Sequence, residues 1–234
     1  MGSEPPPEIC CDFNGRMTKH GYLLTRGTID DLAKLGLTPE TAVGRRFVFN
    51  GGGDANEGEL MSEIMSEGTI IRHPDFGFLL ECDVQIYWRP ILRPSTPADL
   101  PALHRVWRRS VEATHDFLAP EHLETLSEVV RDFYLPTTIF LLATDVNDQP
   151  VGFLGGEDGT IEALFVDPDW FGKGVGRVLM DEALKRAPVV KLDVNEQNAK
   201  ARRFYERLGF VVVGRSETDG AGLPYPLLHL ERRG

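Results

Sequence analysis

The spacing of hydrophobic residues changes near residue 90. Before it, short apolar runs such as residues 46–49 and 76–80 alternate with turn-forming stretches rich in glycine, proline and aspartate. Runs of this length between turn formers are typical of β-strands. The pattern therefore predicts a small, mostly β domain over residues 1–89. It ends in a connector at residues 87–94 that contains two prolines.

Two capping signals predict where helices begin. Thr28 stands three residues before Asp31, the spacing of a capping box, and apolar residues follow as far as residue 35. Thr96 stands three residues before Asp99, with a proline directly after the threonine. We expect one short helix after each of these caps.

After residue 90 the helical and strand patterns are clearer. Apolar residues recur at helical spacing as far as Val111, and a second helix opens at Ala119. The elements expected next are strands at 138–144, 150–154 and 160–166, a helix at 175–187, a strand at 189–194, a helix at 199–208, and strands at 210–216 and 225–230. This order predicts an α+β domain over residues 90–234, with a mixed sheet and helices on both faces.

Composition excludes several classes of protein. The net charge of −11 argues against a nucleic-acid partner, and we find no compact basic patch. No apolar run approaches the roughly 20 residues that span a bilayer, and the first residues lack a signal-peptide core, so we expect a cytoplasmic protein without a membrane partner. Cys10, Cys11 and Cys82 show neither disulfide nor zinc-site spacing, and no metal is expected.

A glycine-rich stretch follows the third strand expected after residue 90. Gly172, Gly174 and Gly176 stand just before a helix, where backbone N–H groups and the positive helix end can hold a pyrophosphate. Lys173 and Arg177 can add full charges. The plainer interpretation is a tight strand-to-helix turn without a ligand. The Walker and dinucleotide patterns both fail, because no Gly-Lys-Ser/Thr follows and the turn does not open a βαβ unit.

A second motif decides between these interpretations. Residues 190–210 carry a set of residues at the spacing of the closing motif of the GNAT superfamily, the CoA-dependent N-acyltransferases: Asn198, Ala201, Phe204, Tyr205, Gly209 and Phe210. With the glycine-rich motif before it, the chain over residues 91–234 resembles that family. Residues 110–118 and 214–227 are similar to a subgroup of small bacterial acetyltransferases within it.

The resemblance implies a GNAT-type sheet and direct transfer of an acetyl group from acetyl-CoA, in a ternary complex, to a primary amine. The acceptor would be a small molecule, an amino acid or a protein lysine. A homodimer is a further expectation. The alternative is an acyl-CoA-binding sensor with little turnover. Phe171 lends it some weight, because the family has Arg or Gln at this position.

The resemblance also implies roles for individual residues. Tyr205 would protonate the departing thiolate, and the motif favours this role over the plainer interpretation of a core tyrosine. The base is left open between Glu162, His115 and water. Acceptor contacts are expected from His115, Asp116 and Asn195. Cofactor contacts are expected from Leu164, Phe165, Val166, Phe171, Gly172, Lys173, Gly174, Val175, Gly176, Arg177, Asn198 and Tyr205.

Overall fold

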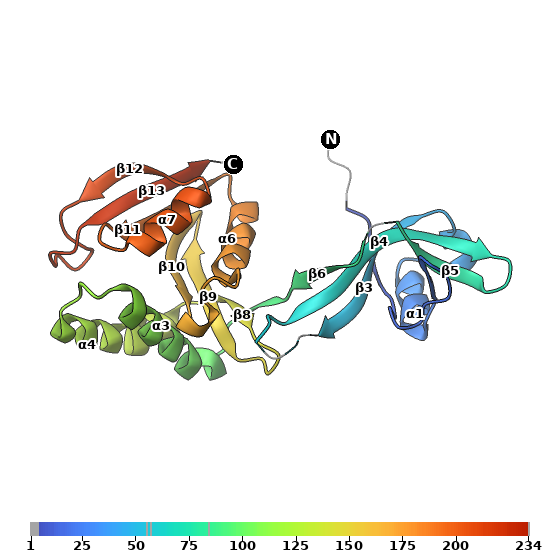
Figure 1. The fold of residues 1–234 in the computed structure, drawn as a ribbon, viewed down its shortest axis with the longest axis horizontal. Helices are drawn as coiled ribbons and strands as arrows, with labels where there is room; N and C mark the ends of the chain where they lie inside the picture. The colour runs from blue at the N-terminus through green and yellow to red at the C-terminus, as the bar shows by residue number, and fades with distance from the viewer. Residues whose placement is uncertain (1–4, 55, 57, 84, 234) are drawn as a thin grey trace. The chain divides into compact units, whose positions relative to one another are not determined.

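The computed structural model describes residues 5–54, 56, 58–83 and 85–233. The chain divides into two compact units, Met1–Ile91 and Leu92–Gly234. Each unit has its own sheet (Figure 1). Each also has its own hydrophobic core. The predicted α+β class is confirmed, with a mostly β region before the larger mixed sheet.

The sheet of the N-terminal unit has the order β1-β3-β4-β5-β2, and β6 pairs with β4. Its strands are β1 (Glu8–Cys10), β2 (Gly21–Leu23), β3 (Arg46–Asp54), β4 (Ser62–His73), β5 (Gly77–Cys82) and β6 (Tyr87–Pro90). Two helices, α1 (Arg26–Lys34) and α2 (Pro39–Ala42), add Leu32 and Ala42 to a core that contains Phe47 and Phe49 of β3. These side chains are almost completely removed from water, so the unit holds itself together by apolar burial.

The cap of α1 differs from the prediction. The N-cap is Thr25, and Thr28 lies one turn inside the helix, where its hydroxyl accepts the Thr25 N–H at 3.0 Å. Thr28 also donates to the Cys10 carbonyl at 2.8 Å, and Asp31 accepts the Cys10 N–H at 2.9 Å. Thr28 and Asp31 therefore hold the helix against β1. The prediction of Thr28 as cap was wrong because Thr25 and Thr28 stand at capping-box spacing themselves.

The C-terminal unit contains a second sheet with helices between its strands. Its strands are β7 (Leu92–Pro94), β8 (Leu141–Thr144), β9 (Pro150–Glu157), β10 (Thr160–Val166), β11 (Val189–Asn195), β12 (Val211–Ser216) and β13 (Leu227–Arg233). Its helical elements are η1 (Pro97–Asp99), α3 (Leu100–Thr114), α4 (Pro120–Val129), η2 (Val130–Tyr134), α5 (Leu135–Thr137), η3 (Pro168–Trp170), α6 (Val175–Arg186) and α7 (Ala199–Arg207). The capping box at Thr96 and Asp99 is confirmed.

β9 continues beyond the predicted end at residue 154, because Gly155 and Gly156 belong to the strand instead of a turn. A Cβ atom on Gly155 would lie 2.6 Å from Phe140 Cε1. This glycine is required for packing, a role that the sequence pattern does not distinguish from a turn.

The second sheet has the order β12-β13-β11-β10-β9-β8-β7. β10 and β11 run parallel, but they pair only at Thr160 with Lys191 and at Ile161 with Leu192. Beyond these residues the two strands separate, whereas β10 stays paired with β9 as far as Val166. Among the described strands, none pairs with the side of β10 that faces β11 from Leu164 to Val166.

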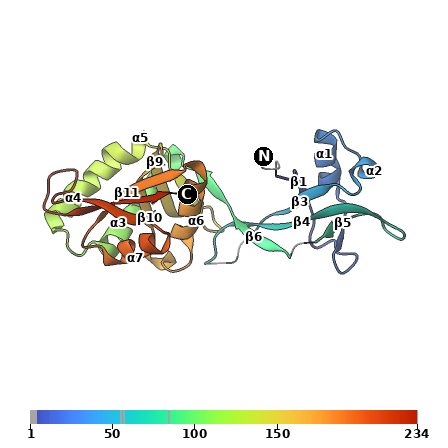
Figure 2. The same ribbon diagram turned by 90° about the horizontal axis from the view of Figure 1, so that it is seen from above.

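Helices cover both faces of this sheet, as predicted. In Figure 2, α6 and α7 lie on one side of the strands and α4 and α5 on the other. Leu103 and Trp107 of α3 share a buried core with Phe140, which directly precedes β8, and with Phe153 of β9. None of the helices in the described part of the chain is long and apolar enough to cross a bilayer.

Candidate active site

The glycine-rich turn joins the end of β10 to α6. Gly172 and Gly174 have φ angles of 76° and 86°, a region that favours glycine. Gly174 is the N-cap of α6, and no side chain caps the helix there. The first N–H groups of α6 are therefore available to an external acceptor, and the positive end of the helix dipole points the same way.

Ion pairs connect this turn to α3. Arg109 donates to Asp167 at 2.8 Å and to Asp169 at 3.0 Å. Asp167 is buried, caps η3 by accepting the Asp169 N–H at 3.0 Å, and donates its own N–H to the Val151 carbonyl. The turn is thus held between α3 and β9 before the glycines begin.

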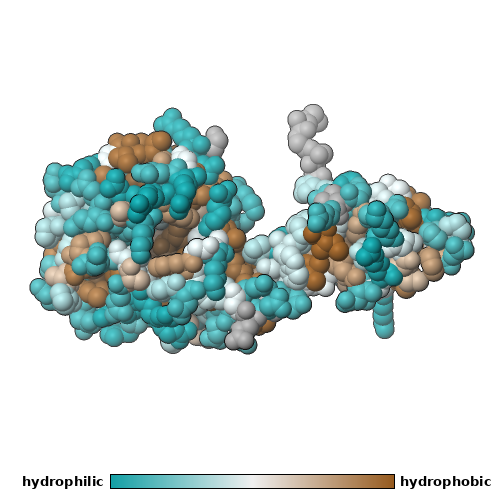
Figure 3. Space-filling view, viewed as in Figure 1, coloured by the Kyte–Doolittle hydropathy of each residue, from teal (hydrophilic) through white to brown (hydrophobic). Residues whose placement is uncertain are grey.

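A cavity of about 440 Å³ lies between the free edge of β10, the start of α6 and α7. In Figure 3, the C-terminal unit is hollowed on the face toward the viewer, where apolar residues are surrounded by hydrophilic ones. The residues predicted from the sequence that line the cavity are His115, Leu164, Phe165, Val166, Phe171, Gly172, Gly174, Val175, Gly176, Arg177, Asn198 and Tyr205.

Four predicted residues lie outside the cavity lining. Lys173 is exposed, with its Nζ 4.7 Å from the centre of the Trp170 ring. Glu162 is exposed at a bulge in β10 and lies 3.5 Å from the Tyr134 hydroxyl, whose pKa is raised to about 12 by burial and then by Glu162. Asp116 is exposed and Asn195 is half-buried at the end of β11.

The sequence interpretation missed part of the cavity wall. The additional lining residues are Ser110, Thr114, Trp170, Lys200, Ala201, Phe204 and Arg207. Lys200, Phe204 and Arg207 recur at helical spacing on α7, a signal that could have identified one face of this helix. Two basic side chains on that face suit a phosphate group.

Tyr205 is buried at the wall of the cavity. Burial raises the pKa of its hydroxyl well above the usual range for tyrosine, so the hydroxyl keeps its proton at neutral pH. Within the described part of the chain, no group forms a hydrogen bond with this hydroxyl, and the ring packs edge-on against Phe204 and Phe210. The hydroxyl is therefore available as a donor to a ligand.

Only part of the Asn198 side chain is available to a ligand in the cavity. Its Oδ1 accepts the Ala201 N–H at 3.0 Å and so caps α7. The amide nitrogen is left as the group that can contact a ligand.

His115 is the C-cap of α3 and lines the cavity. The Thr114 hydroxyl donates its single hydrogen to the Ser110 carbonyl at 2.7 Å, so it must accept a hydrogen from His115 Nδ1 at 2.8 Å. In the neutral ring, Nε2 then carries the lone pair. Burial lowers the pKa of His115, and the Val111 backbone, Asn195 and Asp116 oppose this only in part.

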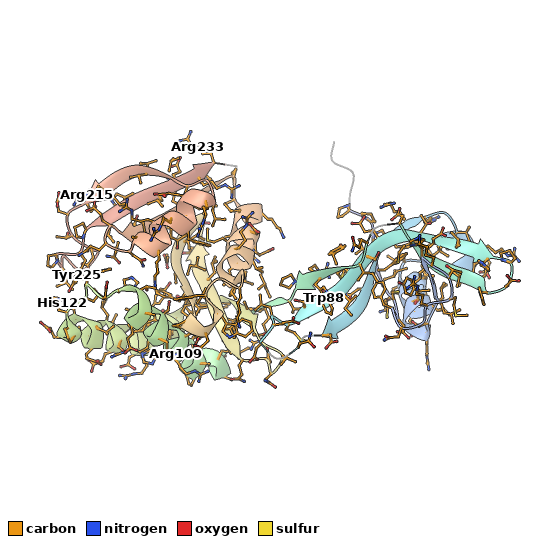
Figure 4. All side chains as sticks on the ribbon, in the orientation of Figure 1. Trp88, Arg109, His122, Arg215, Tyr225 and Arg233 are labelled. Carbon is orange, nitrogen blue, oxygen red and sulfur yellow. The ribbon has the colours of Figure 1, made fainter. Side chains whose placement is uncertain are left out.

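Aromatic side chains border the site beyond His115. The Phe117 ring lies 5.3 Å from the His115 ring and 6.0 Å from the Tyr225 ring. Tyr225 comes from the loop before β13 and lies beside His122 of α4 (Figure 4). Among the residues described, no group of His, Cys, Asp and Glu side chains could hold a metal ion.

Comparison with known proteins gives consistent results. Residues 110–227 match the model of the acetyltransferase (GNAT) domain. The peptidyl-lysine N-acetyltransferase YjaB of Escherichia coli is 51% identical over 125 residues, which are 53% of this chain and 84% of that protein. This match confirms the resemblance to small bacterial acetyltransferases. The N-terminal unit lies outside the residues that match the family model.

Two solved structures have the same fold. The solution structure of apo YjaB from E. coli aligns with a TM-score of 0.58 at 48% identity, over 60% of this chain and 95% of that one. The PaiA N-acetyltransferase of Thermoplasma acidophilum, solved in complex with coenzyme A, aligns with a TM-score of 0.51 at 22% identity, over 62% and 98%. This second likeness concerns the fold alone.

Proposed function

The chain belongs to the GNAT acetyltransferase family, and on this premise we propose that it transfers the acetyl group of acetyl-CoA directly to the side-chain amine of a protein lysine. The observation that carries the proposal is one cavity bordered by the free edge of β10, the uncapped start of α6 and the Tyr205 hydroxyl. These three features suit the three parts of the reaction: holding the donor arm, holding its phosphates and releasing the thiolate.

The donor would lie along the separation of β10 and β11. The unpaired backbone from Leu164 to Val166 can pair with the amide groups of the pantetheine arm, as an added strand would. The pyrophosphate would accept hydrogen bonds from the N–H groups after Gly174, with Lys200 and Arg207 adding charge from α7. The Val166 N–H would stabilise the negative charge that develops on the thioester oxygen.

Tyr205 would act on the departing sulfur. The CoA thiolate needs a proton or a hydrogen bond as the new amide forms. A tyrosine hydroxyl that burial keeps protonated, and that no described protein group occupies, can supply either.

His115 is our proposed base, in preference to Glu162. A lysine amine has a reference pKa near 10.4 and must lose a proton before it attacks. Because its pKa is lowered, His115 is neutral at neutral pH and its Nε2 can accept that proton directly or through water. Glu162 lies outside the cavity lining, beside Tyr134.

The named relatives support a protein lysine as acceptor. The test uses the full chain, acetyl-CoA and a peptide that has one lysine and a blocked N-terminus. We expect one acetyl group on the lysine side chain and one CoA released for each. Bound acetyl-CoA without CoA release for any peptide or small amine would instead indicate the sensor. An acetylated form of the protein in the absence of acceptor would contradict direct transfer.

The base assignment has its own test. His115→Gln should lower kcat/KM by about tenfold or more at neutral pH, with partial recovery as rising pH deprotonates the free amine. Glu162→Gln should stay within about twofold of the wild type. The opposite ranking would assign the base to Glu162.

A further inference from the structure

Three polar side chains form a hydrogen-bonded line across three neighbouring strands of the second sheet. Asp193 Oδ1 of β11 lies 2.7 Å from His229 Nδ1 of β13, and His229 Nε2 lies 2.8 Å from Ser216 Oγ of β12. Asp193 and His229 are direct cross-strand partners. Gly214 stands opposite His229 on the other side, and a Cβ atom there would lie 3.0 Å from His229 Cδ2. The glycine therefore leaves the space that the imidazole ring occupies.

The chemistry of the three groups fixes the direction of each hydrogen bond. An ionised carboxylate only accepts, so His229 Nδ1 carries the hydrogen that binds Asp193. In the neutral ring Nε2 then has the lone pair, and Ser216 donates to it. His229 and Ser216 thus fix the orientation of the Asp193 carboxylate. Oδ2 of Asp193 has no hydrogen bond or ion pair with any residue that the structure describes.

This line lies on the sheet face that leads to the active site. Leu192 and Val194 are buried, so Asp193 and Asn195 point to the opposite face of β11. Asn195 lies close enough to His115 to affect its pKa. Two residues along a strand span about 6.6 Å, so the backbone of Asp193 lies about that far along β11 from Asn195.

No lysine or arginine in the described part of the chain forms an ion pair with Asp193. Glu231, on the same face, is paired with Arg233 at 2.7 Å and with Lys191 at 3.9 Å. The Asp193 side chain is 54% exposed, and its partner is a histidine. A fixed and accessible carboxylate beside a transfer site is suited to bind a cation.

We propose that Asp193 binds a basic residue that flanks the target lysine in the acceptor protein, and that His229 and Ser216 are positioning residues for this contact. The inference rests on the proposed function. An acceptor segment that crosses this face, with its lysine at His115, would carry a neighbouring arginine or lysine to Asp193. The chain would then prefer lysines in basic segments.

The test removes the charge from each partner in turn and uses the full chain described above. Pairs of blocked single-lysine peptides carry either arginine or its neutral isostere citrulline, at each flanking position in turn. The wild type should prefer the arginine peptide by roughly fivefold in kcat/KM for at least one position, the upper end for one exposed ion pair. Asp193→Asn should reduce this preference below about twofold, and added salt should weaken it in the wild type.

Control variants separate recognition from general effects. Glu206→Gln removes one negative charge from an exposed position of α7 and should keep the full preference. His229→Gln and Ser216→Ala should retain part of the preference, with the KM for acetyl-CoA unchanged. An equal preference in the wild type and Asp193→Asn, or none in the wild type, would overturn this inference alone. If the wild type acetylates no lysine peptide, the proposed function fails and the inference falls with it.

Discussion

The Tyr225 hydroxyl lies 2.6 Å from His122 Nδ1 and thereby joins the loop before β13 to α4. It also accepts the Ala119 N–H at 3.0 Å, so it contacts both the residue that caps α4 and a side chain of that helix. Tyr225 and His122 stand 103 positions apart in the sequence. One hydroxyl therefore fixes the separation between α4 and this loop.

Removing that hydroxyl should loosen this connection. Tyr225→Phe leaves the Ala119 N–H and His122 Nδ1 without their partner, at a cost of about 1–2 kcal/mol in the free energy of unfolding. The measurement is urea denaturation of both proteins. The control, Tyr87→Phe, changes an exposed tyrosine and should stay within about 0.5 kcal/mol. Equal effects from the two variants would show that the Tyr225 hydroxyl does not stabilise the fold.

The phosphate-binding assignment of the glycine turn predicts a specific loss of affinity. Gly174→Ala should weaken CoA binding by about tenfold or more, since the methyl group obstructs close approach to the start of α6. Gly174 has φ +86°, so the variant also carries backbone strain. Gly222→Ala is the matched control, because Gly222 has φ +79° with no atom near its added Cβ and lies outside the cavity lining.

Calorimetric titration of CoA into both glycine variants separates strain from ligand contact. We expect similar losses of thermal stability but a change in CoA affinity only for Gly174→Ala. If both variants bind CoA as the wild type does, the turn is a strand-to-helix connection without a phosphate.

The order of elements could be predicted because local chemistry marks where they begin and end. Thr96 and Asp99 form the capping box that their spacing predicts, and Gly174 precedes α6 at the expected place. Where two signals overlap, as at Thr25 and Thr28, the sequence alone could not decide which residue caps the helix.

The site could be predicted only where its residues lie on continuous motifs. The motif from Phe171 to Arg177 borders the cavity except for Lys173, and Asn198 and Tyr205 do as well. The direction of the Glu162 side chain depends on a bulge in β10, because the bulge changes the alternation of side chains along the strand. The line from Asp193 to His229 depends on the register of β11 against β13. No local pattern encodes that register, since it is set by the packing of the whole sheet.

The ion pair between Arg93 and Asp99 predicts a pH-dependent contribution to stability. Arg93 donates to both oxygens of Asp99, at 2.8 and 2.9 Å, and Thr96 adds two more hydrogen bonds. Arg93 first, and then Thr96, hold the pKa of Asp99 far below its usual range, against the opposing effect of burial. A depressed folded-state pKa stabilises the protein above the unfolded pKa of about 3.9, and this stabilisation is lost as the pH falls.

Asp99→Asn should therefore cost about 1–3 kcal/mol at pH 7. The difference from the wild type should be constant above about pH 5 and should narrow below about pH 4. Urea denaturation over this range is the measurement. Asp148→Asn removes the other carboxylate on Arg93, but that side chain is 68% exposed, so its cost should stay below about 1 kcal/mol. A gap that widens in acid would contradict the sign of the linkage.

The role proposed for Tyr205 predicts a change in kcat without a matching change in binding. Tyr205→Phe removes only the hydroxyl and keeps the ring packed against Phe204 and Phe210. General acids typically contribute about 100- to 10,000-fold, and a thiolate leaves moderately well unaided, so we expect a fall in kcat of at least about tenfold. The affinity for CoA should stay within about threefold, because the contact forms mainly in the transition state.

Tyr134→Phe removes a hydroxyl outside the cavity lining and should leave kcat within about twofold. A parallel collapse of CoA affinity and kcat in Tyr205→Phe would make the hydroxyl a ground-state binding contact. An unchanged kcat would assign the proton to water, since the buried ring alone would then account for Tyr205.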